Sequence, residues 1–137
     1  MKKIYSKIEK DKLLHIILRK EDVLEERVNI IDNDQFLQLA AMKLNKGKTF
    51  APHRHVYCDK ITKIAQESWV VIEGKIKAVL YDLDDTIICE SILECGGVSI
   101  TLYGGHTYKI LEDNTLVYEY KTGPYLGIGK DKEFIDD

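Results

Sequence analysis

The segment from residue 67 to residue 82, ESWVVIEGKIKAVLYD, constrains the fold of this chain most strongly. Two runs rich in β-branched residues lie on either side of Glu73 and Gly74. Such runs favour strands, and glycine readily adopts the positive φ that a tight turn requires. The segment therefore predicts a hairpin. Because strand side chains alternate, we expect Glu67 and Trp69 on the same face.

Similar runs continue through the second half of the chain. We expect further strands over residues 87–93, 98–103 and 115–125, separated by turns that contain glycine, aspartate or asparagine. The acidic stretch over 82–86 lacks the ligand spacing of an EF-hand calcium loop, so we interpret it as a solvated hairpin tip. Eight or more short strands with such turns predict an all-β fold, either an antiparallel sandwich or a barrel.

The first half of the chain has a more mixed pattern. The run LLHIIL follows Asp11, which can cap a helix, and predicts a short helix over residues 11–19, although a strand would suit the same run. We expect His15 to be a partly buried structural residue. Further strands are expected over residues 36–44, where apolar residues occupy both odd and even positions, and over residues 49–57. The predicted organisation is a helical and linker segment over 1–26 and a single β-domain over 27–137.

The length, charge and cysteine content of the chain limit the kinds of partner that we expect it to bind. A chain of 137 residues that is 45% hydrophobic can bury the core of one domain. With a formal charge of -3, the chain is not expected to have the basic surface that binding to nucleic acid or an anionic membrane would require. No apolar run in the sequence is long enough to span a bilayer. For lack of such a run, and of an apolar stretch behind the first lysines, we expect a cytoplasmic protein. The three cysteines lack C-x-x-C spacing, so we expect reduced thiols.

Two histidines separated by one residue are the clearest candidates for chemistry. His53 and His55 share one face of the strand expected over 49–57, because strand side chains have a period of two. Glycines precede and follow this region at Gly47 and Gly74, and Glu67 lies between them. Imidazole and carboxylate are ligands for divalent first-row metals, and a histidine tuned near neutral pH can also act as a general base.

The pattern formed by Gly47, His53, His55, Glu67 and Gly74 resembles the first sequence motif of the cupin superfamily. The later stretch GGVSITLYGGHTYKILEDN resembles the second motif, and His106 stands in the position of its histidine. The resemblance implies a metal site made by His53, His55, Glu67 and His106, holding iron, manganese, nickel or zinc. Eleven residues separate His55 from Glu67, more than is usual in the family, and this connection is either a lid over the site or a longer surface loop.

A narrower resemblance extends from Arg27 to the end of the chain. The order RVNI, LAAMKLNKGKTFAPHRH, SWVVIEGKIKAVLYD and LVYEYKTGPYLG is similar to that of the WbuC-like cupins, which are associated with bacterial surface-polysaccharide gene clusters. This resemblance implies an antiparallel, jelly-roll type cupin β-barrel. The short helix predicted over residues 11–19 would precede this barrel. Because cupins often pair through their sheets, we also expect a homodimer.

Several residues near the predicted site have two interpretations. The resemblance places Arg27 and Asn29 near the barrel mouth, where they would bind a polar or anionic substrate group; a surface salt bridge is the alternative. Trp69 either stacks against substrate or fills the core. Glu119 is a candidate catalytic carboxylate if the charged face of the last strand points inward. The sequence leaves open whether Gln66 or Glu67 faces the site.

Three functions are consistent with these observations. The first is a metal-dependent isomerase, epimerase or lyase that acts on a sugar or nucleotide-sugar in bacterial surface-polysaccharide biosynthesis. The second is a metal-free isomerase or epimerase in which His53 or His55 acts directly as the general base. The third is a sugar-binding module without turnover. The fold alone does not distinguish these three functions.

Overall fold

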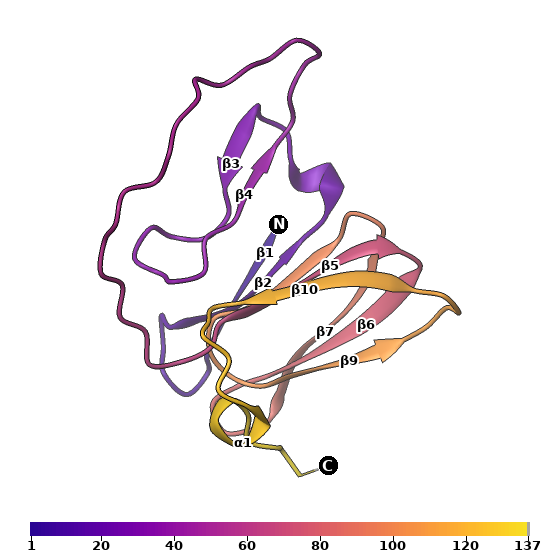
Figure 1. Ribbon diagram of the computed structural model, residues 1–137. Coiled ribbons are helices and arrows are strands. Elements are labelled where there is room, and N and C mark those ends of the chain that lie inside the picture. Colours follow the sequence, from indigo (N-terminus) through magenta and orange to yellow (C-terminus); the bar gives the residue numbers. More distant parts are fainter. Residues whose placement is uncertain (137) are drawn as a thin grey trace.

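The computed structural model describes residues 1–136, and its regular secondary structure consists almost entirely of antiparallel strands (Figure 1). The all-β prediction is therefore confirmed. The largest sheet has the order β1-β2-β8-β5-β10. Its strands are β1 (Lys2–Tyr5), β2 (Leu13–Leu18), β8 (Val98–Thr101), β5 (Glu67–Glu73) and β10 (Leu116–Lys121).

Two smaller sheets complete the fold. The three-stranded sheet has the order β7-β6-β9, from β7 (Ile87–Glu94), β6 (Lys75–Tyr81) and β9 (His106–Ile110). The two-stranded sheet pairs β3 (Arg27–Asn29) with β4 (Ala40–Met42). A 3₁₀ turn, η1 (Lys20–Asp22), and the one-turn helix α1 (Ile128–Asp131) are the helical elements of the described chain. Within residues 1–136, no helix is long and apolar enough to cross a bilayer.

The large sheet is the middle layer of the molecule. One of its faces packs Ile17 and Val71 against Ile76 and Leu80 of the three-stranded sheet, forming an inner core. Its other face packs against a second apolar cluster from the segment that contains β3 and β4; this cluster includes Ile30, Ile31 and Leu37. Both faces of the central strands are therefore removed from water.

This burial explains why the helix predicted over residues 11–19 is wrong. The run LLHIIL forms β2, which pairs with β1 on one side and β8 on the other. A strand covered on both faces is apolar at every position, so its sequence lacks the alternation that distinguishes a half-buried strand from a buried helix. The first 26 residues thus contribute two strands to the large sheet, and their helical content is limited to the η1 turn.

The hairpin predicted around Gly74 is also wrong, although both of its strands exist. β5 pairs with β8 and β10, whereas β6 pairs with β7 and β9, so the chain passes at Gly74 from one sheet to the other. Gly74 has a φ of +80°, which favours glycine. A Cβ at this position would also lie 2.9 Å from the Cα of Thr115. Gly74 therefore forms a tight corner between the two layers.

The strands predicted before residue 67 are shorter than expected or not formed. Of residues 36–44, only Ala40–Met42 form a strand. The segment over 43–66 contains neither a strand nor a helix, and it forms the long open connection between β4 and β5 in Figure 1. Pro52 within this segment cannot donate a ladder hydrogen bond. The strand predicted over 49–57, with the histidine pair on one face, is therefore wrong.

Candidate functional site

The most distinctive polar contact of the interior joins the two main sheets. Glu67 is the first residue of β5 and His106 is the first residue of β9. The Nε2 atom of His106 lies 3.0 Å from Oε1 of Glu67. The Glu67 side chain is only 7% exposed and that of His106 is 22% exposed. The structure thus places a carboxylate and an imidazole in direct contact at one end of the sandwich, with partial access to solvent.

An aromatic pair lies beside this contact. Trp69 follows Glu67 on the same face of β5, and its ring stacks on that of Tyr108 with centroids 4.1 Å apart. The indole Nε1 donates to Oε1 of Glu67 at 3.2 Å and to Oε2 of Glu119 at 3.0 Å. Glu119 lies opposite Trp69 in the β5–β10 ladder. We call Glu67, Trp69, His106, Tyr108 and Glu119 the Glu67 cluster.

The surroundings of Glu67 favour its ionised form. Burial alone raises the pKa of this carboxyl group. The hydrogen bond and charge of His106, together with the charges of Lys132 and Lys121, outweigh burial and leave the pKa below its usual value. An ionised Glu67 accepts the Nε2–H of His106, so the neutral imidazole has its free lone pair on Nδ1. Among the described residues, none is hydrogen-bonded to this Nδ1 atom.

Tyr108 is held in its protonated form. Burial is the main reason that its pKa lies above the usual value, and the charges of Glu67 and Glu119 act in the same direction. Its hydroxyl group donates to Oγ of Ser99 at 3.2 Å. The phenol therefore supports the aromatic stack and does not supply a proton readily near neutral pH.

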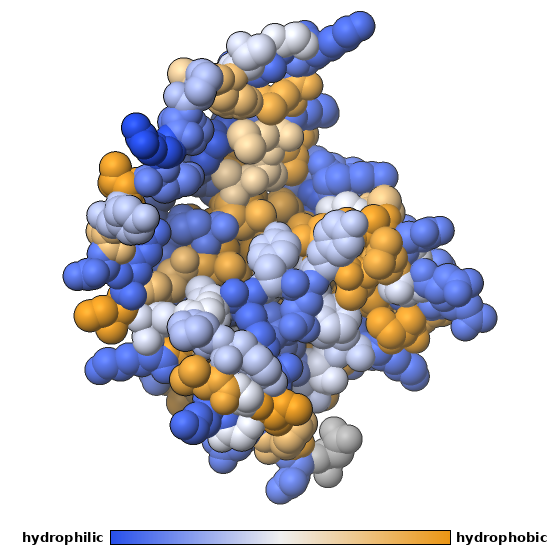
Figure 2. Space-filling model, viewed as in Figure 1, coloured by the Kyte–Doolittle hydropathy of each residue, from blue (hydrophilic) through white to orange (hydrophobic). Residues whose placement is uncertain are grey.

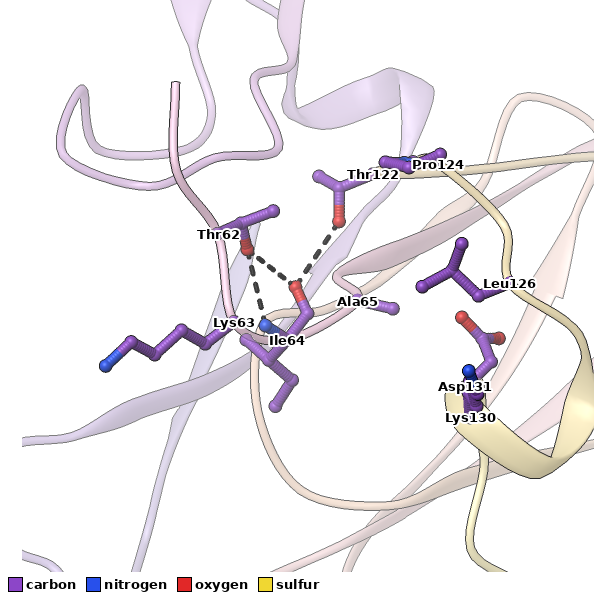
Figure 3. A pocket seen from close by; sticks show the side chains of 10 residues that line it. Thr62, Lys63, Ile64, Ala65, Thr122, Pro124, Leu126, Lys130 and Asp131 are labelled. Carbon is purple, nitrogen blue, oxygen red and sulfur yellow. Dashed lines mark hydrogen bonds between the residues drawn. The ribbon is translucent and has the colours of Figure 1, made fainter. Parts of the chain in front are cut away.

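A lysine links the cluster to the C-terminal segment. The Nζ atom of Lys121 lies 2.9 Å from Oδ2 of Asp131 and 4.0 Å from Oε2 of Glu67. The hydrogen bond to Asp131 is the main reason that the pKa of Lys121 is raised. Beyond this ion pair lies a cavity of about 190 Å³ between residues 62–65 and 122–131, shown in Figure 3.

The two early histidines do not join this site. His53 and His55 are exposed on the 43–66 segment, with ring centroids 5.6 Å apart, and Nδ1 of His53 contacts the carbonyl oxygen of Ala51 in the same segment. In the space-filling view this segment borders a gap in the molecular surface (Figure 2). Without the predicted strand, the pair has no ladder to hold it against the inner core.

The predicted metal ligands are therefore only partly assembled. Within residues 1–136, no group of three or more histidine, cysteine, aspartate or glutamate side chains is placed to hold a metal ion. Glu67 and His106 meet, but one carboxylate and one imidazole are fewer than the three or four protein ligands of a typical zinc site. The ligand set as arranged does not fit a bound metal.

Arg27 and Asn29 lie in a different layer from the Glu67 cluster. Both are exposed on β3, and Nε of Arg27 donates to Oδ1 of Asn29 at 3.2 Å. Their neighbour Val28 packs on the second core, whereas Trp69 packs on the inner core, across the large sheet. The structure thus brings Trp69 and Glu119 to the candidate site and leaves Arg27 and Asn29 away from it.

The structure also distinguishes the two residues at the start of β5. The side chain of Gln66 turns toward the second core, where its Oε1 accepts the backbone N–H of Leu37 at 2.8 Å. Glu67 consequently faces the opposite direction, toward His106. The alternation of β10 places Lys121 on the same face as Glu119, but no sequence pattern pointed to Asp131, which reaches the site from a one-turn helix.

Comparisons of the chain with models of known protein families, with curated proteins and with solved structures find no match, so no family is shown for it.

Proposed function

We propose that the Glu67 cluster binds a sugar or nucleotide-sugar and catalyses its isomerisation or epimerisation by proton transfer through His106. The observation that carries the proposal is the 3.0 Å contact between His106 and the buried Glu67, beside a stacked aromatic pair. The proposal takes up the metal-free alternative to the metal-dependent enzyme and moves the base from the early histidine pair to His106.

The contact between His106 and Glu67 suits acid–base chemistry. A carboxylate that accepts Nε2–H orients the imidazole and stabilises the imidazolium that forms when Nδ1 takes a proton. The substrate proton would be one that is acidified by a neighbouring carbonyl group, as in aldose–ketose isomerisation or epimerisation next to a keto group. In isomerisation the imidazolium returns the proton to the neighbouring carbon while the hydroxyl proton passes to the former carbonyl oxygen. In epimerisation the enolate turns over, so that the imidazolium returns the proton to its other face. Glu119 offers a second carboxylate on the far side of the indole N–H.

The remaining parts of the cluster suit a carbohydrate. Glu67 and Glu119 offer acceptors for hydroxyl groups, and the stacked Trp69 and Tyr108 rings form an apolar border beside them. The resemblance to the WbuC-like cupins adds the biological setting, bacterial surface-polysaccharide biosynthesis. In keeping with that resemblance, we propose that the two main sheets are the halves of a jelly-roll type cupin barrel.

Solvent exchange tests this proposal even when the product is unidentified. The protein would be incubated in D₂O with a panel of nucleotide-sugars, including 4-keto forms, and carbon-bound deuterium would be followed by NMR. We expect exchange at a carbon next to a carbonyl group, and a loss of roughly 10²–10⁴-fold in rate for His106→Gln. Exchange that persists unchanged in a correctly folded His106→Gln variant would exclude His106 as the base.

One observation favours a second candidate, the metal-dependent enzyme. Two of the four predicted ligands, Glu67 and His106, are already adjacent, and the 43–66 segment that carries His53 and His55 leads directly into β5. This function requires that the segment move so that both histidines reach the cluster. Elemental analysis of protein purified without a histidine tag tests the requirement. Near-stoichiometric iron, manganese, nickel or zinc that is lost in the double variant His53→Ala, His55→Ala supports it, whereas a metal content below a few per cent contradicts it.

A further inference from the structure

The cavity shown in Figure 3 is linked to the Glu67 cluster through Asp131, which lines the cavity and pairs with Lys121 near Glu67. One wall is formed by residues 62–65, which immediately precede β5, and the other by residues 122–131, which follow β10. The two walls are tied together at their inner end, because Oγ1 of Thr122 accepts the backbone N–H of Gln66 at 3.0 Å, and the N–H of Thr122 is bonded to the carbonyl group of Gln66. The cavity is therefore anchored at the end of β5 that carries Glu67.

The lining of the cavity combines three charged side chains, Lys63, Lys130 and Asp131, with apolar surface. The hydroxyl groups of Thr62 and Thr122 both contact the carbonyl oxygen of Ile64, at 2.8 Å and 3.5 Å, and are engaged in holding the wall. In Figure 3, Asp131 directs its carboxyl group toward Leu126 and the open space. Only Oδ2 of Asp131 is paired with Lys121, so Oδ1 can accept further hydrogen bonds.

The size and the lining of the cavity restrict the kind of ligand that it can bind. A volume of about 190 Å³ is smaller than the roughly 300–1,000 Å³ of pockets that enclose a whole drug-sized ligand, so it accommodates one ring at most. Asp131 is paired with Lys121, Lys63 extends away from the cavity in Figure 3, and Lys130 lines the cavity next to Asp131. Pro124 and Leu126 offer an apolar contact to a ring face. This apolar contact and the free acceptor of Asp131 suit an uncharged ring with hydroxyl groups, and the titration with phosphate tests whether the lysines select an anion instead.

We propose that this cavity is a second subsite, which holds one neutral monosaccharide ring of the substrate while the reacting ring lies at the Glu67 cluster. Asp131 accepts hydroxyl hydrogen bonds through Oδ1, and Leu126 packs against the ring. The inference rests on the proposed function, since it describes how the same site recognises the rest of its substrate. It implies that the preferred substrate is larger than a single sugar unit.

The test uses the full chain and simple sugars. A ¹⁵N-labelled sample would be titrated with glucose, galactose and N-acetylglucosamine at millimolar concentrations, and separately with inorganic phosphate. We expect at least one sugar to shift the amide signals of Thr122, Leu126 and Asp131, and a weakening of about tenfold in Asp131→Asn. Leu126→Trp fills the cavity and should abolish the shifts. The matched control is Ile128→Trp, which alters an exposed neighbour outside the lining and should preserve them.

The outcomes separate this inference from the proposed function. The subsite is wrong if no sugar shifts these amides, if phosphate shifts them instead, or if Leu126→Trp and Ile128→Trp behave alike. For any nucleotide-sugar that undergoes exchange, Leu126→Trp should raise KM at least tenfold with little change in kcat. Unchanged KM would overturn the subsite while leaving His106 as the base. Sugar binding in the cavity together with a complete lack of exchange would support the subsite and overturn the acid–base function.

Discussion

Two histidines face the interior of the same sandwich but differ in their chemistry. His106 is partly exposed and contacts a carboxylate, so its imidazolium form has a counter-charge. His15 is fully buried: its Nε2 donates to the carbonyl oxygen of Tyr81 at 2.9 Å and its Nδ1 lies 3.1 Å from Oγ1 of Thr101. Burial is the main reason that the pKa of His15 is lowered to about 4, and the charge of His106 acts in the same direction. The proposed base thus lies at the rim, and a neutral structural histidine lies behind it.

The low pKa of His15 predicts that the protein loses stability as the pH falls. Between the folded pKa of about 4 and the unfolded value of 6.5, the unfolded state binds more protons, so the free energy of unfolding rises with pH over this window. From pH 7 to pH 5 we expect this histidine to account for a loss of about 2 kcal/mol. Urea denaturation at both pH values measures the loss. The difference between the two pH values should shrink in His15→Gln, and an equal difference in both proteins would contradict the assignment.

Among the structural elements, the corner at Gly74 is the one on which the geometry of the site depends most. It directs β5 into the large sheet and β6 into the three-stranded sheet, and therefore determines that Glu67 faces strand β9 across the core. Its positive φ alone would be tolerated by other residues at some cost, but the backbone of Thr115 leaves no room for a side chain. The corner thus has both a conformational and a steric requirement for glycine.

Alanine substitution separates these two requirements. Gly47 has a φ of +88°, and a Cβ added there would have no other atom within 4 Å, so Gly47→Ala should cost only the left-handed conformation, about 1–2 kcal/mol. Gly74→Ala meets the same conformational cost and also clashes with Thr115, which should add about 1–3 kcal/mol. Chemical denaturation of both variants measures the difference. Equal destabilisation of the two variants would show that the Gly74 corner has room to relax.

The molecule as a whole has three layers, and its segments differ in how well they are shielded from solvent. The large sheet is covered on both faces, and all four residues of β8 are buried. The connection over residues 43–66 instead exposes apolar side chains such as Val56, Tyr57 and Ile61, which are 85%, 108% and 79% exposed. Buried, fully paired strands open only with global unfolding, whereas segments with few buried contacts open locally.

Native-state hydrogen exchange tests how local stability differs between the buried strands and the exposed connection. The amides of β2 and β8 should exchange most slowly, with opening free energies close to that of global unfolding. Those of residues 43–66 should exchange faster by several orders of magnitude, because the backbone groups of this connection lack a strand partner. Strong protection over residues 49–57 would indicate that the segment forms the strand that its sequence predicts. The expected homodimer stays a prediction, and the mass in solution measures it.

The all-β class, the approximate positions of most later strands and the shared face of Glu67 and Trp69 followed from the sequence, because alternation and turn chemistry are local properties. The local pattern could not reveal that LLHIIL is a strand, since burial on both faces removes the alternation. Nor could it show that β5 and β6 join different sheets, that His106 and Asp131 approach Glu67 from distant segments, or that His53 and His55 lie outside the core. Those features depend on which strands pair and which faces are covered, and only packing between residues far apart in the chain decides them.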